Sequence, residues 1–124
     1  MRDALIVSTA RTPIGRAYRG AFNATHAPTL AAHAMRAAVE RSGVDPAEIE
    51  DVVFGAALQQ GSQYTIARNG ALRAGLPVTV AAQSIDRQCA SGLMAIAIAA
   101  KHNTMLDPEP SAEIARRLAA YLLD

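Results

Sequence analysis

A lone cysteine stands at the head of an apolar segment, in the stretch SIDRQCASGLMAIAIAA at residues 84–100. If a helix begins at about this point, the Cys89 sulfur lies beside unpaired backbone N–H groups at the positive end of the helix dipole. That setting favours the thiolate, which is the nucleophilic form of the side chain. The residues that follow, Ala90, Ser91 and Gly92, are small and leave the approach to the sulfur open. The stretch therefore indicates nucleophilic acyl chemistry at Cys89.

A purely structural role for Cys89 is the alternative. Cysteine is among the most buried residue types, and a single cysteine in an apolar segment is more often a packing residue than a nucleophile. The position at a helix start, and the charge that Arg87 can add nearby, shift this balance only modestly. Residue type and spacing alone leave both interpretations open.

The composition limits the possible classes of protein. The 124 residues are enough for one ordinary domain, and a chain that is 51% apolar but lacks tryptophan must build its core from small aliphatic side chains. A net charge of +1 with scattered arginines predicts no nucleic-acid partner. The single cysteine excludes an internal disulfide, and no zinc motif accompanies it, so we expect no metal. We find no signal-peptide pattern and no apolar run long enough for a membrane span, and we therefore expect a cytoplasmic protein with no membrane partner.

Strands and helices are predicted to alternate, which is typical of an α/β layered fold with crossover connections. Buried or candidate strands are expected at 4–7, 51–57 and 78–85. Amphipathic helices are expected from Leu30 to a left-handed cap at Gly43, and from Tyr64 to a stop at Gly75 and Pro77, with a short helical turn capped by Asp45 between them.

The third helix is apolar in every direction over residues 93–100. A helix with no polar face is normally buried on all sides, whereas one small sheet covers only one flank. Leaving several aliphatic side chains in water would cost several kcal/mol, at about 25 cal/mol per Å². We therefore expect something outside the helix's own sheet to lie against it.

Three segments resemble the thiolases. DRQCASGLMAI at 86–96 is similar to their nucleophile segment, STARTPIG at 8–15 to their amino-terminal signature, and ARNGALRAGLP at 67–77 to their second helix and the following turn. The three occur in the family's order and at appropriate intervals, and the nucleophile segments typical of β-ketoacyl and hydroxymethylglutaryl synthases do not match. The resemblance favours Cys89 as the nucleophile over the structural alternative.

The resemblance implies a thiolase-like half-domain in which the nucleophile begins a buried apolar helix in a central layer. It implies an acyltransferase that carries an acyl group between Cys89 and coenzyme A, in 3-ketoacyl-CoA thiolysis or in acetoacetyl-CoA formation. The Cys89 backbone N–H is then a candidate oxyanion-hole donor. Acyl-CoA and coenzyme A are the expected small-molecule partners, no cofactor or metal is required, and the strand at 78–85 implies a homo-oligomer.

The resemblance ends near Lys101, which predicts a partial thiolase amino-terminal domain over 1–101. Residues 102–124 do not match the family, and we expect a polar connection and then an amphipathic helix capped by Ser111. Ile114, Leu118, Tyr121 and Leu122 would share its apolar face. A deletion, a frameshift or a replacement element would each account for such a tail.

The family's activating histidine and acid/base cysteine belong to Gly-His-Pro and Cys-x-Gly segments, which these 124 residues do not contain. His26, His33 and His102 lie in no such motif and are expected to be solvated or locally hydrogen-bonded. The alternative function is therefore a catalytically incompetent thiolase fragment that acts only in self-association or in association with a full-length thiolase.

Overall fold

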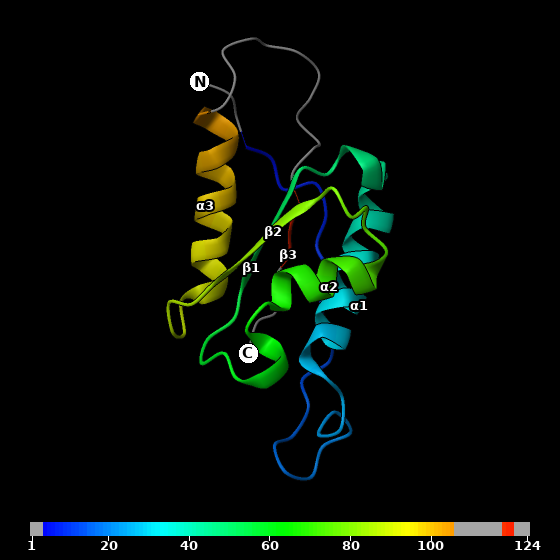
Figure 1. The fold of residues 1–124 in the computed structure, drawn as a ribbon, viewed down its shortest axis with the longest axis vertical. Helices are drawn as coiled ribbons and strands as arrows, with labels where there is room; N and C mark the ends of the chain where they lie inside the picture. Colours follow the sequence, from blue (N-terminus) through cyan, green and yellow to red (C-terminus); the bar gives the residue numbers. More distant parts are fainter. Residues whose placement is uncertain (1–3, 106–117, 121–124) are drawn as a thin grey trace.

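The computed structural model describes residues 4–105 and 118–120 (Figure 1). In chain order the elements are α1 (Ala27–Ser42), the 3-10 turn η1 (Pro46–Glu48), β1 (Asp51–Gly55), the 3-10 turn η2 (Gly61–Gln63), α2 (Ile66–Ala74), β2 (Ala81–Ile85), α3 (Ser91–Met105) and β3 (Leu118–Ala120). Strands and helices alternate, which confirms the predicted α/β class.

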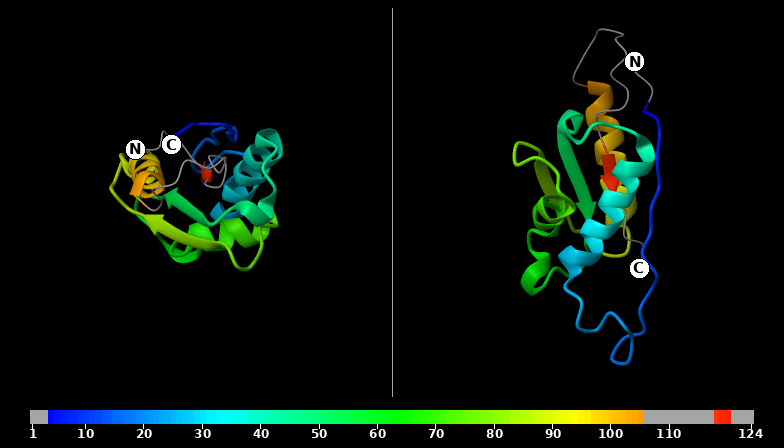
Figure 2. Two further views of the ribbon diagram at one scale, coloured as in Figure 1. Left: turned by 90° about the horizontal axis from the view of Figure 1, so that it is seen from above. Right: turned by 90° about the vertical axis from the view of Figure 1, so that its right-hand side faces the viewer.

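The strands form one parallel sheet in the order β2-β1-β3. Gly55 is opposite Ile85 in the register, so β1 and β2 end level with each other at their carboxyl ends. Figure 1 and the left-hand view of Figure 2 show α3 on one side of the strands and α1 on the other. The chain is therefore layered, with β1 in its middle.

Alternation along β1 divides its side chains between the two layers. Val52 and Phe54 belong to the main core with Met35 of α1 and Ala67 of α2. On the opposite face, Gly55 lies against the start of α3. The continuous apolar run of β1 is thus explained by burial on both faces.

Gly55 allows α3 to approach the sheet very closely. A Cβ built on Gly55 would lie 2.5 Å from the carbonyl oxygen of Ser91 and 2.5 Å from the Gly92 nitrogen. No real side chain tolerates such contacts with backbone, so only glycine fits here. The end of β1 therefore fixes where α3 begins, and with it the segment that carries Cys89.

The helix ends follow the sequence signals. Gly43 and Gly75 adopt the left-handed conformation, with φ of 69° and 92°, directly after α1 and α2. The Asp45 carboxylate accepts a hydrogen bond of 2.9 Å from the Ala47 N–H at the start of η1. These three local predictions are confirmed.

The predicted strand at 78–85 begins three residues later, at Ala81. The guanidinium of Arg68 in α2 donates to the carbonyl oxygens of Val78 and Val80, at 2.9 and 2.5 Å. Because Arg68 takes these two acceptors, the segment before β2 forms a turn instead of a strand.

The prediction of a buried strand at 4–7 is wrong. These residues form no strand, and Ile6 is 71% exposed. Both edges of β1 are already paired, one with β2 and the other with β3, so the apolar run has no place beside the buried strand. Two residues after this run, the Thr9 carbonyl accepts a hydrogen bond of 2.8 Å from the Arg41 guanidinium of α1.

Two predictions for the carboxyl-terminal part are also wrong. Helix α3 continues to Met105, through residues that were expected to form a polar connection. Residues 118–120 form strand β3 instead of part of a closing helix, and their pairing with β1 overrides the helical preference of leucine and alanine. Ser111, Ile114, Tyr121 and Leu122 lie outside the described residues.

Helix α3 is only partly covered by the residues that the structure describes. Ala95 is fully buried, whereas Leu93 is 70% exposed. One sheet covers one flank, as the sequence argument requires, but the expected burial on all sides is not reached in the single chain. The expectation that something outside the helix's own sheet lies against this flank stays a prediction.

Candidate functional site

Cys89 lies in the short loop that joins β2 to α3. Because β1 and β2 are parallel, this loop is at the carboxyl edge of the sheet, where ligands bind in open α/β folds. The helix begins at Ser91, two residues after the cysteine, and the Cys89 side chain is exposed. The sulfur is therefore reachable just outside the first turn of α3, slightly further from the helix than the sequence predicts.

Hydrogen bonds fix the conformation of the loop. The Ala90 N–H donates to the Arg87 carbonyl at 3.0 Å, and the Ser91 N–H donates to the Gln88 carbonyl at 3.0 Å. Ser91 is only 4% exposed. Its hydroxyl accepts a hydrogen bond of 2.8 Å from the Arg87 N–H and donates one of 2.6 Å to the Gln88 carbonyl. Ser91 thus connects both Arg87 and Gln88 to the first residue of α3.

These bonds also determine the direction of the Cys89 backbone N–H. The Gln88 carbonyl and the Cys89 N–H belong to one peptide group, and in a trans peptide they point in opposite directions. Since Ser91 holds the carbonyl toward α3, the N–H points away from that helix. No atom within the described residues accepts a hydrogen bond from it. Cys89 therefore carries both the sulfur and, next to it, a backbone N–H donor that could stabilise an oxyanion formed by attack of that sulfur.

Gln88, directly before the nucleophile, has a φ of 50°. This left-handed conformation is uncommon for a residue with a side chain and costs of order 1 kcal/mol or more. The Asp86 carboxylate supports it, because Oδ1 accepts 3.0 Å from the Gln88 N–H.

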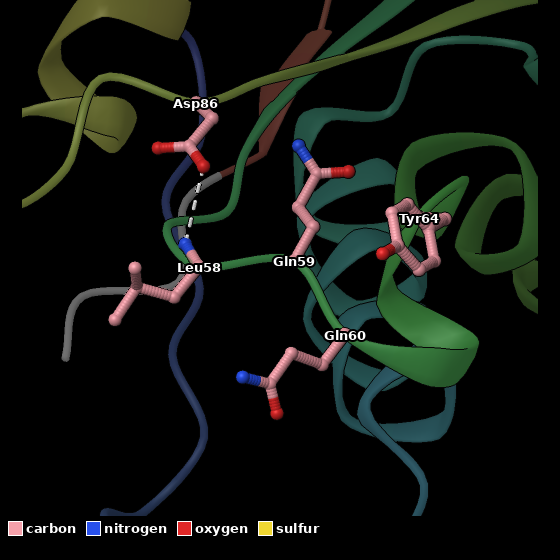
Figure 3. Close-up of a pocket in the computed structure, with 5 residues that line it drawn as sticks. All are labelled: Leu58, Gln59, Gln60, Tyr64 and Asp86. Atoms are coloured by element: carbon pink, nitrogen blue, oxygen red, sulfur yellow. Dashed lines mark hydrogen bonds between the residues drawn. The ribbon is translucent and has the colours of Figure 1, made fainter.

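Asp86 was not identified from the sequence. It lines an open pocket with Leu58, Gln59, Gln60 and Tyr64, all from the segment that follows β1 (Figure 3). The dashed line in Figure 3 joins Asp86 to the Leu58 N–H, which donates to Oδ2 at 3.2 Å. An aspartate two residues before a turn residue is a recognisable signal for the local bond to Gln88, but no local signal reveals the bond to Leu58.

The other sequence candidates lie elsewhere. The Arg87 guanidinium donates to the Met94 sulfur at 3.8 Å, so the side chain extends along α3. His26 directly precedes α1 and His33 lies within it, on the other side of the strands from α3. The side chain of His102 lies outside the described part of the chain.

No three His, Cys, Asp or Glu side chains gather as a set of metal ligands in residues 4–105 and 118–120. Within the same ranges, no helix combines the length and the apolarity that crossing a membrane requires.

Comparisons with known proteins agree on one family. Residues 4–105 match the family described as "Thiolase, N-terminal domain". Over 100 residues the chain is 43% identical to the acetyl-CoA acetyltransferase of Cupriavidus necator, covering 81% of this chain and 25% of the relative. It is also 43% identical over 101 residues to the 3-ketoacyl-CoA thiolase of Saccharophagus degradans, covering 80% of this chain and 26% of the relative.

A solved structure agrees with these relatives. The acetyl-CoA acetyltransferase of Syntrophomonas wolfei superimposes with a TM-score of 0.74 at 38% identity, covering 81% of this chain and 25% of that one. The chain spans about a quarter of the length of the relatives that it matches. From the matched range, the identities and the shared fold, we conclude that this chain belongs to the thiolase family and corresponds to an amino-terminal portion of it.

Proposed function

We propose that this chain supplies the nucleophile of a thiolase-type acyltransferase, in which Cys89 carries an acyl group between a 3-ketoacyl-CoA and coenzyme A. The observation that carries the proposal is that one exposed residue, in a hydrogen-bonded loop, carries both the thiol and a backbone N–H that has no acceptor among residues 4–105 and 118–120. The names of the relatives, which include acetyl-CoA acetyltransferase and 3-ketoacyl-CoA thiolase, support the substrate class.

In the degradative direction the Cys89 thiolate attacks the keto carbon of a 3-ketoacyl-CoA. The carbonyl electrons move to oxygen, and the Cys89 N–H is the donor on this chain that can hold the resulting oxyanion. When the carbonyl reforms, the bond to the α-carbon breaks, and its electron pair leaves with the acetyl-CoA enolate, which takes up a proton. The thiolate of a second coenzyme A then attacks the acyl thioester, and the Cys89 thiolate leaves.

In the synthetic direction the same steps run in reverse. One acetyl-CoA acetylates Cys89 and releases coenzyme A, and the enolate of a second acetyl-CoA takes the acetyl group to give acetoacetyl-CoA. Forming or breaking the carbon–carbon bond needs a positioned proton donor and acceptor. Exchange of an acetyl group between coenzyme A and Cys89 needs fewer groups, and this exchange is the part of the reaction to test on this chain.

Incubation of the full 124-residue chain with acetyl-CoA, followed by intact mass measurement, tests the proposal. We expect each chain to gain one acetyl group and the Cys89→Ser variant to gain none. Because Cys89 is the single cysteine, no other thiol competes. An unmodified wild-type chain, or equal acetylation of the Cys89→Ser variant, would contradict the proposal.

A second candidate function is association without catalysis. Two observations favour it, namely the exposed outer flank of α3 around Leu93 and the position of β2 at an edge of the sheet. An open strand edge pairs readily with another chain, which also underlies our proposal of a homo-oligomer through the segment at 78–85. Stable dimers in light scattering, together with failure to acetylate, would favour this function over the first. A cytoplasmic location stays a prediction.

A further inference from the structure

The carboxylate of Asp86 connects the two loops at the carboxyl edge of the sheet. Asp86 directly follows β2, and its Oδ1 accepts 3.0 Å from the Gln88 N–H in its own loop. Its Oδ2 accepts 3.2 Å from the N–H of Leu58, in the loop that follows β1 (Figure 3). One side chain therefore bonds to two backbone segments that are 28 residues apart in the chain.

Both donors belong to residues in an unfavourable backbone conformation. Leu58 has a φ of 51° and Gln88 a φ of 50°, and neither is a glycine. Such conformations persist where surrounding interactions hold them. Bonds from an ionised carboxylate to N–H groups are stronger than neutral ones, and Asp86 provides one bond to each of the two strained residues.

The bond from the Gln88 N–H to Asp86 holds the peptide group directly before the one that carries the Cys89 N–H. Asp86 holds the nitrogen side of Gln88, while Ser91 holds its carbonyl oxygen from the other side at 2.6 Å. With both ends of Gln88 held, the plane of the following peptide group cannot rotate freely. The direction of the Cys89 N–H therefore depends on Asp86 as well as on Ser91.

We infer that Asp86 is a positioning residue for the acyl-transfer chemistry of Cys89, an inference that rests on the proposed function. It acts by holding the N–H of Gln88 and linking it to the loop after β1, so that Gln88, whose carbonyl Ser91 holds, keeps the conformation in which the Cys89 N–H meets the oxyanion. Asp86 itself does not touch the reacting atoms. Its loss should impair the reaction that forms an oxyanion and spare a reaction of the same sulfur that forms none.

Two reactions of the single thiol separate these effects. Acetylation by acetyl-CoA passes through a tetrahedral oxyanion, whereas alkylation by iodoacetamide is a direct displacement at carbon. In Asp86→Ala we expect acetylation to slow by about 10- to 100-fold, because the donor is misplaced but not lost. We expect alkylation to stay within about twofold, because Cys89 is exposed and its access is unchanged.

Two further variants serve as controls. Asp86→Asn keeps one acceptor oxygen, sufficient for the bond to Gln88, but its NH2 group cannot accept from Leu58, so an intermediate rate of acetylation is expected. Asp51→Asn alters a half-buried carboxylate at the amino end of β1, which accepts a hydrogen bond of 3.5 Å from the Gln83 amide. We expect it to leave both reactions within about twofold, because Asp51 is at the end of β1 that is remote from the Cys89 loop.

Each outcome decides one point. Wild-type acetylation with an unchanged rate in Asp86→Ala would overturn the inference and leave the proposed function standing. Equal slowing of both reactions in both Asp86 variants would also overturn it, because this result indicates general disruption. If the wild-type chain is not acetylated, the proposed function fails, and amide hydrogen exchange then tests only whether Asp86 holds the two loops: faster exchange at Leu58 and Gln88 in Asp86→Ala supports that structural part of the inference, and unchanged exchange overturns it.

Discussion

Gly55, the last residue of β1, lies so close to Ser91, the first residue of α3, that an added Cβ would stand 2.5 Å from the Ser91 carbonyl oxygen. This contact joins the end of the central strand to the start of the helix that follows Cys89. The position of the nucleophile loop is therefore set by backbone packing beneath it, and not by the loop residues alone.

Replacing Gly55 by alanine should be strongly destabilising. The methyl group meets backbone that cannot move without shifting α3, and we expect a loss of about 2–4 kcal/mol in the free energy of unfolding. Gly75→Ala is the matched control, because the added Cβ meets no atom within 4 Å. Its free energy of unfolding should fall only by the cost of a φ of 92° in alanine, about 1 kcal/mol. Urea unfolding followed by circular dichroism measures both, and equal losses would show that the contact with Ser91 is unimportant.

Ser91→Ala removes the hydroxyl that holds the loop. The Arg87 N–H loses its acceptor, which should cost about 1–3 kcal/mol, and the Gln88 carbonyl keeps only its bond from the Ser91 N–H. Ser42 offers a close comparison, because its hydroxyl also donates to a carbonyl, of Val39, and accepts from an N–H, of Val44. We expect Ser91→Ala and Ser42→Ala both to lose stability, but only Ser91→Ala to slow acetylation of Cys89. Equal acetylation rates would contradict the role of Ser91 in the site.

Substitutions at Gln88 test whether its backbone holds the left-handed conformation. A β-branched residue tolerates a positive φ poorly, so Gln88→Val should lose about 1–3 kcal/mol of stability, whereas Gln88→Gly should stay within about 1 kcal/mol of the wild type. Thermal unfolding distinguishes the two substitutions. A valine variant as stable as the glycine variant would mean that Gln88 does not hold this conformation in solution.

The two flanks of α3 should respond differently to charge. Leu93→Glu changes a side chain that is 70% exposed, and we expect less than about 0.5 kcal/mol of lost stability together with weaker self-association. Ala95→Glu places a carboxylate at a fully buried position and should unfold the chain. Unfolding curves and light scattering check both variants. Unchanged association in Leu93→Glu would mean that this flank is not the contact surface.

Local signals in the sequence were sufficient for the helix ends and the nucleophile. Gly43, Gly75 and Asp45 act through their own backbone or their nearest neighbours, so their roles can be predicted without the fold. The segment around Cys89 could be located because its motif is contiguous.

Features that depend on long-range pairing could not be predicted in this way. Residues 4–7 read as a strand, yet β3 holds the remaining edge of β1, and nothing local reveals which segment pairs there. The roles of Gly55 and Asp86 likewise depend on neighbours far away in the chain, Ser91 and Leu58. The site was therefore predictable at the nucleophile and not in the residues that position it.

The most direct test of the central claim is to locate the acetyl group by peptide mass spectrometry after incubation with acetyl-CoA, and then to add free coenzyme A. We predict that the modification lies on Cys89 as a thioester and that coenzyme A removes it, regenerating acetyl-CoA. An acetyl group on lysine only, a Cys89 adduct that coenzyme A leaves in place, or no adduct at all would contradict the assignment of Cys89 as the acyl carrier.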